Sequence, residues 1–334
     1  MSAPGSWEIS AADRELFHRE LDSFLPHRIF DAHAHFYRRR DFRGVVPALA
    51  VEGPEDVGLA EFLDWSRRMT PGREYSTLAF AFPAADADLE GANEFATSEA
   101  RSDAASRAAM LVEPEMDADF VRDAVRRLKF SGLKCYHVYS ATRPTFEAEV
   151  SSYLSEAHVR VAHEERLTIT LHLVRARALA DAANQQAIRY YAERYPNARF
   201  VLAHAGRGFN PHHTIEGIGA LKGLRNVWFD TSAVCDGGAY EAILEAMGVE
   251  RLLYGSDFPV SLLRARPVAL GDSFLWVSAE NTDFSAAYAN VRPATVGLES
   301  LRALKLACHH MRLGDSGVER VFFRNAAELL DLNG

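Results

Sequence analysis

The sequence predicts a single (β/α)8 barrel, an α/β fold in which eight parallel strands alternate with covering helices. Eight short apolar runs recur along the chain with helical patterns between them, which is the order that a closed parallel barrel needs. The length of 334 residues fits one such domain. The cluster Gly206-Arg207-Gly208 lacks the third glycine of a dinucleotide-binding fingerprint, which disfavours an open doubly wound sheet. We therefore treat residues 1–334 as one domain.

The composition is that of a globular protein, with 48% hydrophobic and 25% charged residues. A net charge of -9 disfavours nucleic-acid binding, which needs a basic surface. The three cysteines, Cys135, Cys235 and Cys308, are too few and too far apart for a disulfide framework or a cysteine zinc site. The sequence shows neither a targeting signal nor an apolar run of about 18 residues. These features predict a soluble cytoplasmic protein without a nucleic-acid or membrane partner.

The predicted elements follow a leading segment, 1–28, which contains a helix over 10–24 with Ser10 as its N-cap. We expect this helix to cover one end of the barrel. Apolar runs predict the strands, and amphipathic spacing or an end signal such as Pro196 predicts the helices. The predicted strands are 29–35, 75–82, 108–112, 133–138, 167–172, 199–204, 226–230 and 251–254. The predicted helices are 56–69, 88–103, 119–130, 146–165, 179–194, 212–222 and 239–247.

Two segments, 36–74 and 262–296, are longer than an ordinary connection between a strand and a helix. We expect them to form lids over the functional site. Their aromatic residues, including Trp65, Phe274 and Trp276, either line a substrate pocket or pack the lids onto the barrel.

The first strand carries the pattern Asp31-Ala32-His33-Ala34-His35. Because strand side chains alternate between two faces, we expect Asp31, His33 and His35 to share one face, with Phe30, Ala32 and Ala34 on the other. Two imidazoles on one face can bind one cation, and Asp31 could orient them from behind. Taken alone, the pair could also be a chance feature of core packing.

Polar residues of the same kind follow several other strands. In a barrel the chemistry lies at the carboxyl ends of the strands, and a buried polar group there is costly unless it is paired or bound to a metal. Each residue alone could be a satisfied core group or a turn cap, but together they predict one site. These residues are Lys134, His172, His204 and Asp257.

The order of these residues resembles the amidohydrolase superfamily. The resemblance covers roughly residues 29–334 and includes Tyr254-Gly255-Ser256-Asp257-Phe258-Pro259. The terminal stretch 325–330 is similar to the last helix of the amidohydrolase-related branch, which includes metal-dependent decarboxylases, lactonases and hydratases. The resemblance implies that one divalent metal, most often zinc, is held by His33, His35, His172 and Asp257.

Three imidazoles and a carboxylate that leave a position for water are also the composition expected of a catalytic zinc site. Zinc lowers the pKa of its water to about 7, which gives a hydroxide nucleophile at neutral pH. His204 would then act as the acid, the base or the carbonyl-polarising group, and Asp257 could accept the proton of the water.

Lys134 has alternative roles. In binuclear members of the superfamily a lysine at this position is carbamylated and bridges two metals, with His172 and His204 as ligands of the second. Lys134 could instead hold a substrate carboxylate or pair with a neighbouring acid.

Candidate substrate-binding residues are Lys134, Tyr136 and Arg207. Tyr136 shares the face of Lys134, whereas His137 reaches the mouth only if the strand ends early. Arg207, with the cluster 38–40, is a candidate clamp for a carboxylate, because a guanidinium matches two oxygens. Any one of these arginines could also be an ordinary surface residue paired with an acid.

The sequence thus predicts a metal-dependent hydrolase in which metal-bound hydroxide attacks an amide, lactone or ester carbonyl of a small carboxylate-bearing substrate. The alternative within the same family is a non-oxidative metal-dependent decarboxylase. A third hypothesis is a barrel that binds a ligand without catalysis. A homo-oligomer is compatible with each.

Overall fold

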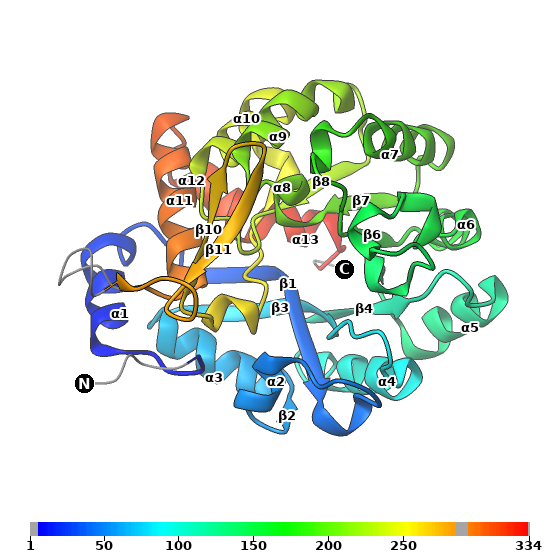
Figure 1. Cartoon of the computed structure of the whole chain (residues 1–334), viewed down its shortest axis with the longest axis horizontal. Coiled ribbons are helices and arrows are strands. Elements are labelled where there is room, and N and C mark those ends of the chain that lie inside the picture. The colour runs from blue at the N-terminus through cyan, green and yellow to red at the C-terminus, as the bar shows by residue number, and fades with distance from the viewer. Residues whose placement is uncertain (1–5, 285–292, 333–334) are drawn as a thin grey trace.

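Eight parallel strands form the barrel in the order of the chain (Figure 1). The computed structural model describes residues 6–284 and 293–332. The ring closes where the Ala32 amide donates to the Tyr254 carbonyl at 2.8 Å and where Ala34 pairs with Phe258. The strands are β1 (Arg28–Arg38), β3 (Glu74–Ala81), β4 (Arg107–Val112), β5 (Gly132–Cys135), β6 (Thr168–Leu171), β7 (Arg199–Leu202), β8 (Val227–Asp230) and β9 (Leu252–Leu253).

The predicted barrel and its eight strands are confirmed. The clearest difference in bounds is β5, which ends at Cys135 rather than at Val138. A short strand, β2 (Asp56–Val57), extends the sheet by pairing antiparallel with the end of β1.

Helices surround the strands (Figure 1). Most predicted helices are confirmed, but the predicted long helix over 146–165 is wrong. Only its last part is α-helical, because Ser155 begins a new helix by accepting a hydrogen bond from the His158 amide. The α-helices between strands are α3 (Leu59–Met69), α4 (Leu89–Ala100), α5 (Ala118–Leu128), α6 (Glu156–Glu164), α7 (Ala182–Arg194), α9 (Pro211–Gly217) and α10 (Gly237–Met247). Shorter or terminal α-helices are α1 (Ala11–Leu16), α2 (Ala48–Glu52), α11 (Val296–His310), α12 (Asp315–Glu319) and α13 (Asn325–Leu329).

The C-terminal helix, not the leading one, fills the amino-terminal end of the barrel. Leu329 and Leu330 pack with Phe30 in the interior core. The leading helix and the turn after it lie outside the barrel against α11, where Arg302 pairs with Glu20 at 2.8 Å. The expectation that helix 10–24 covers one end of the barrel is therefore wrong.

A bulge in β1 changes which side chains face the interior. The register with β3 shifts between Asp31 and Ala34, and such an extra residue interrupts the alternation of faces. Asp31 and Ala34 face outward, into the layer between the barrel and its helices. The predictions that Asp31 shares a face with the two histidines and that Phe30 and Ala32 face away from them are therefore wrong. The interior-facing residues of this strand are Phe30, Ala32, His33 and His35.

The second predicted lid, 262–296, contains a two-stranded hairpin, which is orange in Figure 1. Its strands are β10 (Ala265–Leu270) and β11 (Ser273–Ser278). Phe274 and Trp276 contact Phe209, with ring centroids 4.8 and 5.7 Å apart, and Phe209 lies 5.2 Å from the His204 ring. The hairpin therefore reaches the mouth of the barrel, whereas residues 285–292 of this predicted lid lie outside the described residues.

The first predicted lid, 36–74, contains α2, β2 and α3. Phe42 and Val45 line a hollow of about 550 Å³ together with Phe82, Tyr136 and Phe146. Trp65 instead packs edge-on against Trp7, at 5.7 Å. That the two segments act as lids stays a prediction.

In the described part of the chain, every helix is too short or too polar to cross a membrane.

Candidate metal centre

His33, His35 and Asp257 converge on one buried point at the carboxyl end of the barrel. The Nε2 atoms of both histidines lie 3.3 Å from Asp257 Oδ1. One ligand atom from each residue lies within 4.8 Å of the other two. Each of the three residues is at most 6% exposed. The structure thus brings together three of the four predicted metal ligands.

Hydrogen-bond partners indicate which nitrogen of each imidazole carries its proton. His33 Nδ1 lies 2.8 Å from Asp230 Oδ2, and His35 Nδ1 lies 3.4 Å from the Ala81 carbonyl oxygen. Because the Asp230 carboxylate only accepts and lies closer to His33 than Asp257 does, His33 Nδ1 donates and its Nε2 presents a lone pair to Asp257. We assign His35 the same tautomer, in which Nδ1 donates to the Ala81 carbonyl and Nε2 is free to bind a cation. Apart from Lys134 Nζ, which lies 3.4 Å from His33 Nε2, these lone pairs and the carboxylate oxygen converge in an arrangement that a cation between them would stabilise. This donor set therefore fits a divalent metal.

The electrostatics of the centre favour the same protonation states. Burial, with a smaller contribution from Lys134, lowers the pKa of His33 to about 3, and burial also lowers the pKa of His35. Burial alone would raise the pKa of Asp257, but His204, His35 and His33 outweigh it and hold that pKa below its usual value. Neutral imidazoles and an ionised carboxylate are the forms that bind metal.

Asp257 reaches the centre from a tight turn after β9. Its φ of 65° is in the left-handed region, and its amide donates to the His33 carbonyl at 2.9 Å. Gly255 allows the close approach, because a Cβ there would lie 2.9 Å from the Cβ of His33.

His172 and His204 contact each other instead of joining this cluster. His172 Nδ1 lies 3.1 Å from His204 Nε2. His204 Nδ1 lies 2.9 Å from the Ser232 carbonyl oxygen, so it donates there and leaves Nε2 to accept from His172. The role of His172 as the fourth ligand stays a prediction, since among the described residues it is outside the His33, His35 and Asp257 group.

A strained turn places His204 and Arg207. The residues of α8 (Ala203–Arg207) include left-handed φ values of 56°, 54°, 70° and 63° at positions 204 to 207. Left-handed backbone costs about 1–2 kcal/mol per residue other than glycine, so other contacts must hold it. The Asp230 carboxylate accepts from the His204 amide at 2.8 Å, and Gly206 packs closely on Leu179. Strain of this kind is typical of functional sites.

Asp230 and Ser232 were not predicted as site residues. Asp230 Oδ2 accepts from His33, and its Oδ1 accepts from the His204 amide and from the Ser232 amide and hydroxyl. Asp230 ends an apolar strand, which is the signal that identified His172 and His204. The same rule, applied to β8, would have found it.

Lys134 lies inside the barrel beside the centre. It is fully buried, and its Nζ lies 3.4 Å from His33 Nε2. Burial lowers its pKa to about 8, against the opposing effect of Asp230 and Asp257. No carboxylate of the described residues lies within 4 Å of this amine, so the structure offers no simple ion pair as its partner.

Arg207 reaches the mouth without an acidic partner. It donates to the Arg175 carbonyl at 3.0 Å, and its guanidinium lies 5.3 and 5.4 Å from the ring centroids of Phe146 and Phe274. Burial lowers its pKa. Among residues 6–284 and 293–332, no carboxylate forms an ion pair with it.

The other predicted binding residues differ in position. The Tyr136 ring contacts the His172 ring, with centroids 4.6 Å apart and planes inclined at 56°. His137, because β5 ends early, lines the hollow beside the mouth. Arg38 pairs with Asp41 at 2.8 Å, and Arg39 donates to loop carbonyls, so these two arginines hold their own loop.

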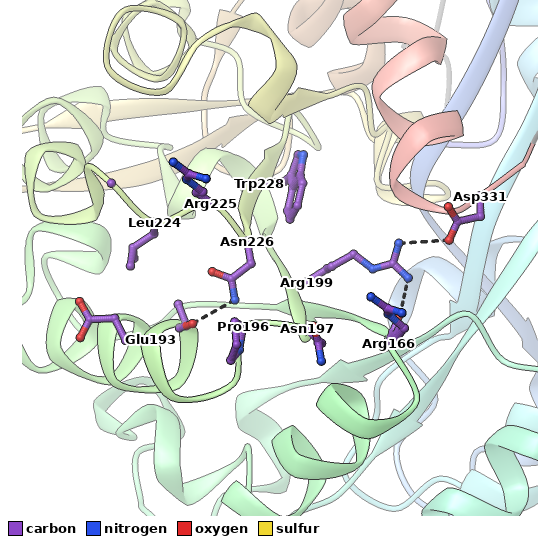
Figure 2. A pocket seen from close by; sticks show the side chains of 12 residues that line it. Arg166, Glu193, Pro196, Asn197, Arg199, Leu224, Arg225, Asn226, Trp228 and Asp331 are labelled. Atoms are coloured by element: carbon purple, nitrogen blue, oxygen red, sulfur yellow. Dashed lines mark hydrogen bonds and ion pairs between the residues drawn. The ribbon is translucent and has the colours of Figure 1, made fainter.

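A larger hollow, of about 700 Å³, lies at the opposite end of the barrel (Figure 2). It is lined by residues such as Arg166, Arg199 and Trp228, where β6, β7 and β8 begin. None of the predicted site residues lines it. The chemistry-bearing side chains are therefore at the other end, next to the hollow of about 550 Å³.

Three solved structures with the same architecture illustrate what this chain is similar to. An amidohydrolase from Burkholderia multivorans with bound zinc has 16% identity and a TM-score of 0.58, covering 91% of this chain and 99% of its own. A protein described as a 2-pyrone-4,6-dicarboxylic acid hydrolase, from Pseudomonas putida, has 15% identity and a TM-score of 0.58, covering 93% and 100%. A dihydroxybenzoic acid decarboxylase from Polaromonas sp. JS666, with bound manganese, has 14% identity and a TM-score of 0.54, covering 93% and 98%. At identities of 14–16%, these three structures show that the fold is shared.

The search of curated proteins found no match by sequence. The family model described as Amidohydrolase, however, matches residues 30–332, which include the barrel and every residue of the centre. The chain therefore belongs to the amidohydrolase family.

Proposed function

We propose that this chain is a metal-dependent hydrolase that attacks the carbonyl of a small, carboxylate-bearing amide, lactone or ester. The observation that carries the proposal is the buried convergence of two imidazole lone pairs and one carboxylate oxygen. His33, His35 and Asp257 would hold one divalent metal, with zinc as the first candidate and His172 as the proposed fourth ligand. Such a metal polarises a carbonyl and lowers the pKa of water to about 7.

The residues of the chain supply the proton transfers. Asp257 Oδ2 lies 4.0 Å from His204 Nδ1, whereas Oδ1 faces the two ligand histidines. We assign Asp257 Oδ2 to accept the proton of the attacking water. His204 then donates its Nδ1 proton to the leaving group as the carbon–nitrogen or carbon–oxygen bond breaks, and the proton held by Asp257 Oδ2 replaces it.

Arg207 is the proposed anchor for the substrate carboxylate. A half-buried guanidinium without an acidic partner binds an anion strongly, because part of its desolvation has already occurred. Tyr136 and Lys134 are the other proposed substrate contacts, near His172 and His33 respectively.

The first test combines metal analysis with a substrate panel. Protein purified without added metal or chelator should contain about one divalent ion per chain. It should hydrolyse lactones, amides or esters that carry a second carboxylate. Protein that binds no metal, even after incubation with zinc or manganese, would overturn the proposal.

The second test concerns Arg207. We expect Arg207→Met to raise KM for a carboxylate substrate about 10- to 100-fold, since a charge-assisted pair contributes about 1.5–3 kcal/mol. The kcat should change much less, and the corresponding neutral substrate should show an unchanged KM. Arg225→Met is the matched control, because Arg225 is an exposed arginine at the opposite end of the barrel. Equal loss for the charged and neutral substrates would contradict the role of Arg207.

Decarboxylation is the second candidate, favoured by the aromatic walls of the hollow beside the centre. Phe42, Phe82, Tyr136 and Phe146 would suit the ring of an aromatic acid. Release of carbon dioxide from such an acid, without hydrolysis of any panel member, would replace the hydrolase assignment with this one.

A further inference from the structure

A small closed cavity lies on the outer side of β1, behind the metal centre. Its volume of about 10 Å³ is close to the room that one water needs. Trp65, Met69 and Phe258 form apolar walls. Asp31 and Ser261 bring polar atoms to the same cavity.

Two of these polar atoms have no partner in the described part of the chain. Asp31 is fully buried, and its Oδ1 accepts from the His33 amide at 3.0 Å and the Ser256 amide at 2.9 Å. Its Oδ2 is unpaired, as is Ser261 Oγ, which belongs to a residue 1% exposed. Burying an unpaired carboxylate oxygen is costly, so native structures satisfy nearly all such atoms. A polar cavity of this size is satisfied by water.

The same residues surround the turn that carries Asp257. Ser256 precedes Asp257 and is held through its amide by Asp31. Ser261 follows it, and the Ser261 amide donates to the Asp257 carbonyl at 3.2 Å. Asp257 has a left-handed φ of 65°, which persists only where neighbouring contacts hold it. Asp31 also fixes the His33 amide at the bulge, so one carboxylate holds the backbone beside two proposed ligands.

We propose that this cavity holds one ordered water between Asp31 Oδ2 and Ser261 Oγ, and that Asp31 with this water is a positioning device for the ligands Asp257 and His33. The water donates to Asp31 and exchanges a hydrogen bond with the Ser261 hydroxyl. This inference rests on the metal centre proposed above. Asp31 faces away from the metal and acts on it only through backbone amides.

The test measures zinc affinity, not activity. Metal-free protein is titrated with Zn²⁺ in competition with a chromogenic chelator, and unfolding is measured in parallel. We expect Asp31→Ala to weaken zinc binding about 10- to 100-fold, as for other residues that orient ligands. Asp31→Asn should recover most of the affinity, because its amide oxygen still accepts both amides. Ser261→Ala, which removes one partner of the water, should cost a few-fold.

A buried amide at the other end of the barrel provides the matched control. Asn226 Nδ2 donates to three carbonyls, those of Ala192, Tyr195 and Ala198, and Figure 2 shows its position. We expect Asn226→Ala to lower stability and leave zinc affinity unchanged, which separates positioning from general loss of stability.

Three outcomes would overturn parts of this inference. Unchanged zinc affinity in folded Asp31→Ala would remove the positioning role. If that variant fails to fold, unchanged zinc affinity in Ser261→Ala would remove the role of the water. A crystal structure that resolves ordered waters and shows this cavity empty would remove the water directly. Wild-type protein that binds no zinc would instead overturn the centre itself.

Discussion

The two sides of the site hold their imidazoles in different ways. On the first side, His33 and His35 from β1 each donate Nδ1 to an oxygen and direct Nε2 at Asp257. On the second side, His172, which follows β6, and His204, which lies in α8 after β7, contact each other through nitrogen atoms. The first arrangement leaves nitrogen lone pairs free to bind a cation. In the second, one proton lies between a nitrogen of His172 and a nitrogen of His204. The same residue type thus serves two chemistries because the partners of its nitrogens differ.

Asp230 joins the two sides. Its Oδ2 accepts from His33 on the first side, while its Oδ1 holds the His204 amide and Ser232 on the second. The backbone amides of His33 and Ser256 both donate to the Asp31 carboxylate. Mutations can therefore disrupt the first side, the second side, or both through Asp230.

The largest effect should come from breaking the first side. Asp257→Asn keeps the shape of the side chain but removes the charge that balances the metal. We expect loss of bound metal and a fall in turnover of at least about 10³-fold, because both activation of the water and proton transfer fail. Elemental analysis and rate measurements check this. His212→Asn, at an exposed histidine of α9, should change neither. Full metal content together with a wild-type rate in Asp257→Asn would refute the assignment.

Breaking the second side should leave the metal in place. We expect His204→Asn to retain about one ion per chain and to lose kcat by about 10²- to 10⁴-fold, the range for general acid–base groups. If wild-type protein holds two ions and this variant holds one, His204 is a ligand and Lys134 becomes the bridging carbamate. That result would erase the distinction between the two sides.

The barrel could be predicted from the sequence because its signals are local. Apolar runs such as 75–82 and 108–112 need no knowledge of their neighbours to be identified as strands. Strand ends then located His172, His204 and Asp257 at one mouth. The comparison of β5 with its prediction shows the limit of such signals. The predicted strand continues to Val138, but the backbone turns at His137.

Features that depend on pairing between distant segments could not be predicted. The bulge after Asp31 arises from the register of β1 against β3, and a shift of one residue exchanges the faces of a strand. The consecutive left-handed residues from His204 to Arg207 depend on Asp230, which comes from another strand. The pairing of His172 with His204 follows from that turn and has no signature of its own in the sequence.

A smaller effect should follow when the link between the two sides is cut. We expect Asp230→Asn to weaken zinc binding about 10- to 100-fold, because one amide cannot satisfy all the donors that the carboxylate holds. Chelator competition measures the affinity, and kcat reports the second side independently. Asp41→Asn is the control, at a buried carboxylate that pairs with Arg38 away from the centre. A fall in kcat with unchanged zinc affinity would show that Asp230 serves the second side alone.

The smallest effect concerns the pH dependence of stability on the second side, where His137 lies 5.5 Å from the His172 ring. Burial, followed by the charge of Arg207, lowers the pKa of His137 to about 4 from its ordinary value of 6.5. Between these two pH values, His137 is therefore protonated in the unfolded chain and neutral in the folded chain. The contribution of neutral His137 to stability is complete above pH 6.5 and is lost as the pH falls toward 4.

Urea unfolding of metal-free protein tests this dependence, because no bound metal then contributes to stability. Between pH 7.5 and pH 5.5, we expect His137→Gln to lose about 1 kcal/mol less stability than wild type. Arg207→Met should fall between the two, because it removes the charge but leaves the burial. An exposed histidine variant, His212→Gln, should follow wild type. If His137→Gln also follows wild type, then His137 is protonated in the folded chain at pH 5.5, and the second side is more open to water than its contacts indicate.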